Sequence, residues 1–159
     1  MKKVLLVFFV LLIVVAGVYY AQNYMKGGQV LSVFKKPAMV TVDSQNFNVT
    51  VAISETEQEI GLSETKSIAP NQGMIFLFDK AGYYSFWMKN MKFPTDIIYI
   101  NNDQIVTIYN DAQIITNQAN PKIYSSTGPS DKVLEIQAGL SERYNFKIGD
   151  KVKYENLGN

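Results

Sequence analysis

Short runs of strand-forming residues, separated by turn signals, dominate the chain after Pro37 and constrain its fold more than any other feature. The runs are rich in β-branched and aromatic side chains, and clusters of Gly, Pro, Asn and Asp interrupt them. Short strands at this spacing predict a mainly β domain over residues 38–159, either a small β-barrel or a jelly-roll-like sandwich. The expected strands are Ala38–Val42, Phe47–Ile53, Met74–Phe78, Tyr83–Lys89, Asp96–Asn101, Gln104–Tyr109, Lys132–Gln137 and Lys151–Tyr154.

One or two short helices are expected among these strands. Ser54 is followed three residues later by Glu57, the pattern of a capping box, so a helix is predicted to begin there. Ile60 and Leu62 would form its apolar side. A helical turn is expected over Gly139–Asn145.

An uncharged apolar run near the amino terminus predicts a membrane segment. Val4–Tyr20 would reach about 25 Å as a helix, and the residue that follows extends it toward the interface of a ~30 Å hydrocarbon layer. We expect residues 1–3 to be a short tail, 4–21 a transmembrane anchor and 22–37 a tether.

A cleaved signal peptide is the alternative reading of the same run, because it would share the basic start and Val14-Val15-Ala16 could serve as its cleavage site. The Lys pair at the start is typical of a secretory targeting segment. We therefore expect a single-pass protein of the cell membrane with its carboxyl-terminal domain outside the cytoplasm, or a secreted protein if the segment is cleaved.

Composition removes several classes of function. Fifteen basic and fourteen acidic residues give a formal charge of +1, without the basic footprint of a nucleic-acid-binding protein. The chain contains neither Cys nor His, which excludes disulfides, zinc sites of the Cys/His kind and Ser-His-Asp triads. We expect no cofactor and no metal site.

The strand expected over Tyr83–Lys89 carries the candidate binding residues. Alternation places Phe86 and Met88 on one face, as core, and Trp87 with Lys89 on the other. An aromatic ring beside a charged side chain could hold a polar ligand such as a sugar.

Asn90 and Asp96 complete this candidate site, because Asn90 follows the strand and Asp96 opens the next one. The structural alternative is that these two residues cap the turn around Pro94 while Trp87 fills one end of a barrel. Both readings stay open at the level of sequence.

An ordered series of motifs resembles the uncharacterised family known as domain of unknown function 192. The resemblance covers about residues 38–154, and the Phe-Trp-Met-Lys-Asn block is its most specific part. It implies a compact β-barrel or jelly-roll-like domain, often behind a signal peptide or anchor, whose activity is not established. The motifs are Gly61-Leu62, Gly73-Met74, Phe86-Trp87-Met88-Lys89-Asn90, Pro94-Thr95-Asp96, Val133-Leu134-Glu135 and Gly149-Asp150.

The chain departs from the family's pattern after its opening motif. The stretch Ser63–Thr65 stands where the family continues with Met and Arg, so Lys66 is the nearest cation. A Lys is a poorer bidentate partner for a carboxylate than an Arg.

The resemblance adds Glu135 as a second recurrent carboxylate beside Asp96. A pair of carboxylates could hydrolyse a glycosidic bond, although alternation would also allow Glu135 to lie in solvent. The full set of predicted ligand-binding residues is Trp87, Lys89, Asn90, Asp96 and Glu135.

Three functional hypotheses follow from these observations. The leading one is a non-catalytic binding module at the cell envelope that recognises a glycan, a peptide or a protein. The second is a hydrolase of envelope glycans that uses Asp96 and Glu135 as catalytic residues. The third is an assembly or stability factor for a membrane complex, acting through the apolar segment before Pro37, which lies within residues 26–36.

Overall fold

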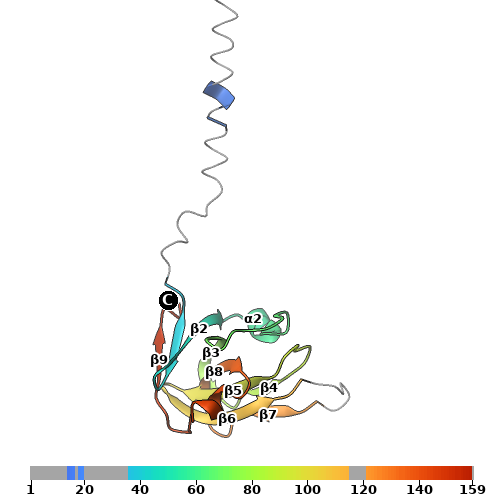
Figure 1. The fold of residues 1–159 in the computed structure, drawn as a ribbon, viewed down its shortest axis with the longest axis vertical. Coiled ribbons are helices and arrows are strands. Elements are labelled where there is room, and N and C mark those ends of the chain that lie inside the picture. Colours follow the sequence, from blue (N-terminus) through green and yellow to red (C-terminus); the bar gives the residue numbers. More distant parts are fainter. Residues whose placement is uncertain (1–13, 17, 20–35, 115–120, 159) are drawn as a thin grey trace, which may run out of the picture. The chain divides into compact units, whose positions relative to one another are not determined.

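The computed structural model of the chain describes residues 14–16, 18–19, 36–114 and 121–158 (Figure 1). The chain divides into two units, Met1–Lys36 and Pro37–Asn159. Residues 14–16 and 18–19 are helical, and the rest of the predicted anchor at 4–21 lies outside the described residues. The tether predicted over 22–37 lies outside them too, except for its last two residues. No helix among the described residues is both long and apolar enough to cross a membrane.

The second unit consists mainly of short strands with two short helices between them. The strands are β1 (Met39–Val42), β2 (Gln45–Ala52), β3 (Gln72–Gly82), β4 (Ser85–Trp87), β5 (Thr95–Asn101), β6 (Gln104–Ala112), β7 (Ile123–Ser125), β8 (Ser130–Gln137) and β9 (Val152–Glu155). The helices are α2 (Glu55–Ile60) and α3 (Leu140–Arg143). The prediction of a mainly β domain with short helices is confirmed.

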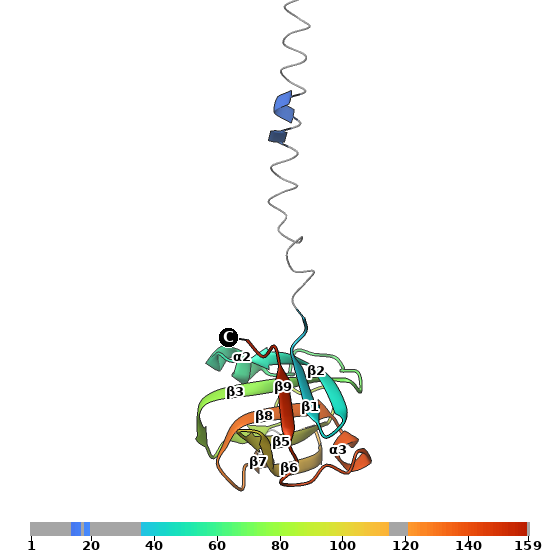
Figure 2. The same ribbon diagram turned by 90° about the vertical axis from the view of Figure 1, so that its left-hand side faces the viewer.

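Seven strands form one sheet in the order β6-β5-β8-β3-β2-β1-β9, and β4 pairs with β7 in a separate two-stranded ribbon. Neighbouring strands are antiparallel except β2 and β3, which run parallel and are connected through α2. The sheet curls into a half-barrel, which neither of the two expected forms describes fully (Figure 2). An isolated bridge between Gln104 and Lys151 brings its two edge strands together at one end.

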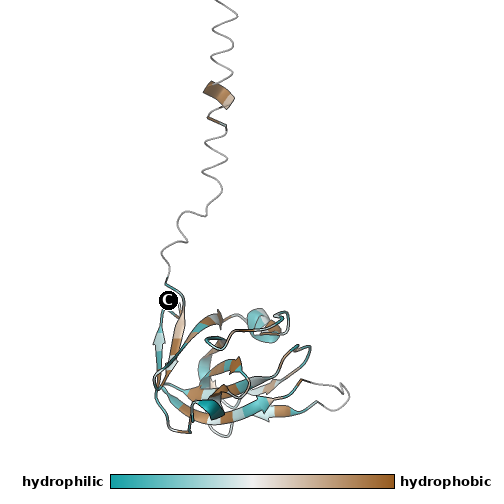
Figure 3. Ribbon diagram, in the orientation of Figure 1, coloured by the Kyte–Doolittle hydropathy of each residue, from teal (hydrophilic) through white to brown (hydrophobic). Residues whose placement is uncertain are grey.

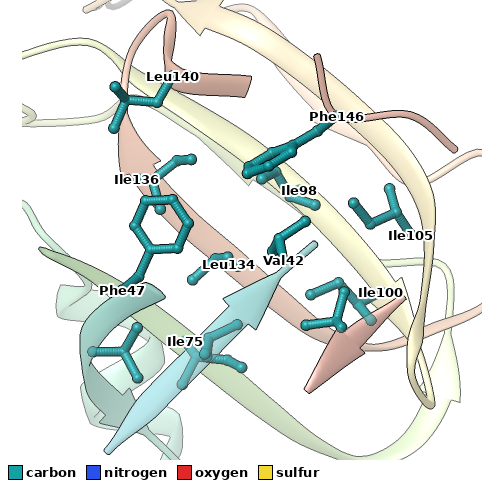
Figure 4. Packing of buried hydrophobic residues seen from close by; sticks show 13 residues of the cluster. Val42, Phe47, Ile75, Ile98, Ile100, Ile105, Leu134, Ile136, Leu140 and Phe146 are labelled. Atoms are coloured by element: carbon teal, nitrogen blue, oxygen red, sulfur yellow. The ribbon is translucent and has the colours of Figure 1, made fainter. Parts of the chain in front are cut away.

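The three central strands β3, β5 and β8 bury side chains on both faces of the sheet. The first core fills the face toward β1, β2 and β9, where Phe47, Ile75 and Leu134 pack with Phe146 (Figure 4). The second core covers the opposite face, where Phe76, Tyr99 and Val133 pack with side chains from the turn after α2 and from β4 and β7. A residue's place along a central strand therefore decides which core it enters.

Residues in α2 and the turn after it cover part of the second core. The capping box predicted at Ser54 is confirmed: the Glu57 N–H donates to Ser54 Oγ (3.3 Å), and the Ser54 N–H donates to the Glu57 carboxylate (2.9 Å). The helix consists mostly of polar residues (Figure 3). Leu62 is buried as expected, whereas Ile60 is exposed.

Gln58 attaches α2 to the sheet. Its side-chain amide donates to the carbonyl of Leu77 in β3 (2.7 Å) and to that of Ile53 (3.1 Å). The helix is thus held beside the middle of β3, at the place where β3 departs from regular pairing with β8.

The expected strand at Tyr83–Lys89 forms only over Ser85–Trp87, and its partner β7 was not predicted from the sequence. The chain turns soon after β4, where Asn90 adopts a positive φ of 59°. The alternation inferred for this segment is nevertheless present, because Phe86 and Met88 pack into the second core and Trp87 is exposed.

Candidate functional site

A cavity of about 450 Å³ lies on the second-core face of the sheet. The wall on one side is α2 with the turn after it, and the wall on the other is β4 with the turn that follows. Side chains of β3 and β8 contribute to its lining. The residues that line it are Gln58–Ser63, Phe76, Phe78, Tyr84–Trp87, Lys89–Met91 and Glu135. Its volume falls within the range of roughly 300–1,000 Å³ that is typical of ligand sites.

Trp87 and Lys89 lie at the exposed part of this cavity. The Trp87 side chain is 48 % exposed, although it is the largest apolar side chain of the chain. The Lys89 Nζ lies over the Trp87 ring, 4.8 Å from its centroid. This is a cation–π contact, so the ring face already attracts a positive charge.

Aromatic rings extend from this part of the cavity toward its interior. Phe86 meets Phe76 edge to face, with the ring centroids 4.8 Å apart, and Phe78 stacks on Tyr84 at 3.7 Å. These pairs fix the orientation of the rings, because each ring packs against another. The cavity therefore offers flat apolar surfaces in a defined arrangement.

Glu135 is the buried carboxyl group among the residues that line the cavity. It lies on the central strand β8, is only 5 % exposed and faces the second core, since Ile97 and Met74 are its neighbours in register. Burial raises the pKa of the Glu135 carboxyl to about 8, because its charged form loses hydration. The sequence left open a solvent-exposed Glu135, and the structure shows that this side chain is buried.

Glu135 influences a neighbouring phenol on β5. The Tyr99 hydroxyl donates a hydrogen bond to the carbonyl of Tyr124 (2.5 Å). The pKa of Tyr99 is raised, chiefly by burial and further by the charges of Tyr109 and Glu135. Tyr99 is thus a neutral hydrogen-bond donor behind the cavity.

Asp96, the other predicted carboxylate, lies elsewhere. It pairs with Ile136 in the sheet, one position away from Glu135, so the two side chains point to opposite faces. Asp96 is fully buried and does not line the cavity. The structure brings together Trp87, Lys89, Asn90 and Glu135, and it separates Asp96 from them.

Three backbone N–H groups donate hydrogen bonds to the Asp96 carboxylate. Those of Asp111 and Gly139 donate to Oδ1 (2.8 Å each), and that of Ser141 donates to Oδ2 (2.7 Å). The carboxylate therefore joins the end of β6 to the start of α3, and it does not cap the turn around Pro94. This arrangement is that of a structural carboxylate.

The segment Gln58–Ser63 was not expected to contribute to the site. The signal that could have found it is the family's opening motif, because Gly61 and Leu62 both lie in this lining. Gly61 ends α2 with a φ of +49°, and a Cβ there would lie 3.4 Å from the Phe76 ring. Lys66, the nearest cation to the departure from the family pattern, does not line the cavity.

The part of the chain that the structure describes contains no group of three or more acidic side chains that could hold a metal ion.

Comparison with known proteins identifies the family. The model of domain of unknown function 192, described as "Uncharacterized ACR", matches residues 38–154, which include the whole cavity. The chain belongs to this family. No curated protein matches it.

Two crystal structures are similar to this family member. A protein of unknown function from Novosphingobium aromaticivorans DSM 12444 is 33 % identical, with a TM-score of 0.65, over 74 % of this chain and 83 % of that one. A protein from Sinorhizobium meliloti 1021, described as a candidate transcription regulator, is 28 % identical, with a TM-score of 0.66, over 74 % of this chain and 91 % of that one.

Proposed function

We propose that this chain is a non-catalytic binding module of the cell envelope, and that it takes its ligand into the cavity between α2 and β4. The observation that carries the proposal is the combination of an exposed Trp87 ring with a buried Glu135 carboxyl in one aromatic-lined cavity. Small-ligand sites typically combine apolar and aromatic walls with polar groups that orient the ligand, and both kinds of side chain line this cavity. Residues 4–21 would hold the module at the outer face of the membrane.

The position of Asp96 favours binding over the hydrolase hypothesis. A pair of hydrolytic carboxylates must flank one bond of the substrate. Asp96 and Glu135 lie on opposite faces of the sheet, and backbone N–H groups already occupy the Asp96 oxygens. The assembly hypothesis rests on residues 26–36, of which only Lys36 is described.

A matched pair of variants on the β4–β7 ribbon tests the cavity as the binding site. Ser85 lines the cavity and Ser125 does not, yet the two hydroxyls share one hydrogen bond (2.8 Å). Trp87 is the only Trp of the chain, so its emission can report binding. The full chain, in a nonionic detergent, is titrated with a panel of envelope glycans, peptides and small organic cations.

A compound that changes the emission of the unsubstituted chain should bind Ser85→Tyr at least tenfold more weakly, because the added ring fills the cavity. It should bind Ser125→Tyr normally, since that variant loses the same hydrogen bond outside the cavity. Equal weakening in both variants, or in neither, would contradict the proposed site. Recovery of the full chain in the soluble fraction of its own cells, with its amino terminus intact, would contradict the membrane anchor.

A further inference from the structure

The fold buries the Glu135 carboxyl without giving it a partner. Its neighbours in register, Met74 and Ile97, are apolar. Among the described residues, the ion pairs join Lys132 to Asp131 and Lys151 to Asp103, and no hydrogen bond reaches the Glu135 side chain. A buried carboxyl without a cation or a donor is costly, so a partner from outside the chain would relieve a real penalty.

The cavity is the route by which such a partner reaches Glu135. Ser141 Oγ is the one side-chain polar atom of the described residues that is both sealed from solvent and unpaired. The Glu135 oxygens are therefore unpaired but still accessible, and Glu135 is part of the cavity lining.

The other charged and titratable groups around the cavity do not neutralise Glu135. Glu59 from α2 is a second carboxyl group and Tyr84 is a phenol, so neither is a cation that could pair with Glu135. Burial raises the pKa of Tyr99, which keeps that phenol neutral. Lys89 is exposed and lies over Trp87. The lining residues of β3, Phe76 and Phe78, carry no charge.

The walls of the cavity suit a cation that carries apolar groups. Aromatic ring faces attract ammonium ions, most strongly when the ions leave water. Trp87 already holds the Lys89 ammonium in this way, at the same cavity. An anionic ligand would meet Lys89 at the exposed part of the cavity, but it would also meet the carboxyl groups of Glu59 and Glu135.

We propose that the ligand of this cavity is a small organic ammonium ion, which pairs with the Glu135 carboxylate while its alkyl groups pack on the aromatic walls. The inference rests on the proposed function and specifies its ligand class. No covalent step is involved.

The inference predicts how affinity changes with pH. Burial holds the pKa of Glu135 near 8, so below that pH a cation must displace a proton before it can pair with the carboxylate. Its affinity should rise about tenfold per pH unit from pH 6 to pH 8 and level off above. A neutral ligand that uses the protonated carboxyl would show the opposite trend.

Choline and 3,3-dimethylbutan-1-ol are the probes, because they share one shape and differ in charge. Each is titrated into the full chain at pH 6, 7 and 8, with calorimetry and Trp87 emission as readouts. Choline should bind more tightly than the alcohol, gain affinity with pH and release a proton on binding. Glu135→Gln should remove both the preference and the pH dependence, whereas Glu64→Gln, at an exposed carboxylate outside the cavity lining, should keep them.

Three results would overturn the inference. If the alcohol binds as tightly as choline, or if Glu135→Gln retains the preference for choline, the ligand is not selected by its charge, and the cavity remains a binding site. If neither probe binds, the cation class fails as well. The Ser85→Tyr and Ser125→Tyr comparison then decides separately whether the proposed function stands.

Discussion

At the scale of single residues, Glu135 and Asp96 show how one sheet gives two carboxyl groups different roles. Asp96 accepts three backbone N–H groups, which satisfy its charge inside the protein. Glu135 has no such donors, and burial raises its pKa. The difference arises because successive positions along a strand face opposite sides of the sheet, and Asp96 is one position out of register with Glu135.

Glu135 should make the protein less stable as the pH rises. The folded state holds its proton up to about pH 8, whereas the ordinary pKa of 4.5 applies to the unfolded chain. Between these values the free energy of unfolding should fall by up to about 1.4 kcal/mol per pH unit. Urea unfolding followed by circular dichroism at pH 5, 6, 7 and 8 measures this slope.

Glu135→Gln should flatten the slope, because an amide does not titrate. Glu59→Gln is the control, since Glu59 is exposed, and it should leave the slope unchanged. A pH dependence that persists in Glu135→Gln would assign it to another group.

Asp96→Asn should lower the free energy of unfolding by roughly 3 kcal/mol. The side-chain amide of this variant would carry no charge, and an NH₂ group would replace one of the two acceptor oxygens. That NH₂ group would then face a backbone N–H, so two donors would meet. Asp111→Asn is a matched control, because Asn also tolerates the positive φ of 52° at that position. Chemical denaturation of both variants gives the comparison, and equal stabilities would refute the structural role of Asp96.

At the scale of elements, α2 is the part of the cavity wall that sequence reasoning described best. The capping box is local, since Ser54 and Glu57 are three residues apart and need no tertiary contact to be recognised. Gln58 attaches this helix to Leu77, which lies 19 positions further along the chain. No local sequence pattern predicts a contact over that separation.

Removal of the N-cap of α2 tests whether the capping box stabilises this part of the cavity wall. Ser54→Ala should cost about 1 kcal/mol of stability, because the Glu57 N–H loses its acceptor. Thr56→Ala lies on the exposed side of the same helix and should have little effect. Thermal unfolding measures both, and an unchanged midpoint in Ser54→Ala would show that packing alone fixes the helix.

The contact between β3 and β8 depends on Gly73. A Cβ at this position would lie 2.6 Å from the carbonyl oxygen of Glu135, so the strands would have to separate. Gly73→Ala should destabilise the protein by about 1–3 kcal/mol, the usual cost of overpacking. Gly128→Ala, where the nearest atom is 3.8 Å away, should be tolerated. Equal urea midpoints for the two variants would contradict this reading of the close approach.

The central strands also explain which parts of the site the sequence could not predict. In β5 the run from Thr95 to Ile100 is buried on both faces, so its residues do not alternate between apolar and polar. The pairing of Asp96 with Ile136 depends on which strands are neighbours, and strand order is not a local property. Trp87, Lys89 and Asn90 were predicted together because they follow one another on the chain.

At the scale of the whole domain, the two faces of the half-barrel differ in their packing. The first core is continuous from β1 and β9 to α3. The second core adjoins the cavity between α2 and β4, where an ionisable group remains accessible. A continuous core on one face can stabilise the fold while the other face provides the binding site.

The central claim is that this domain keeps a carboxyl group unpaired inside an open cavity, and a carbon-13 NMR titration tests it most directly. The full chain is labelled at the glutamate carboxyl carbons, and Glu135→Gln identifies the resonance of Glu135. We expect that resonance to titrate with a midpoint near pH 8, and choline to lower the midpoint. A midpoint near the ordinary value of 4.5 in the free protein would contradict the claim, because it would mean that the charge is already stabilised within the fold.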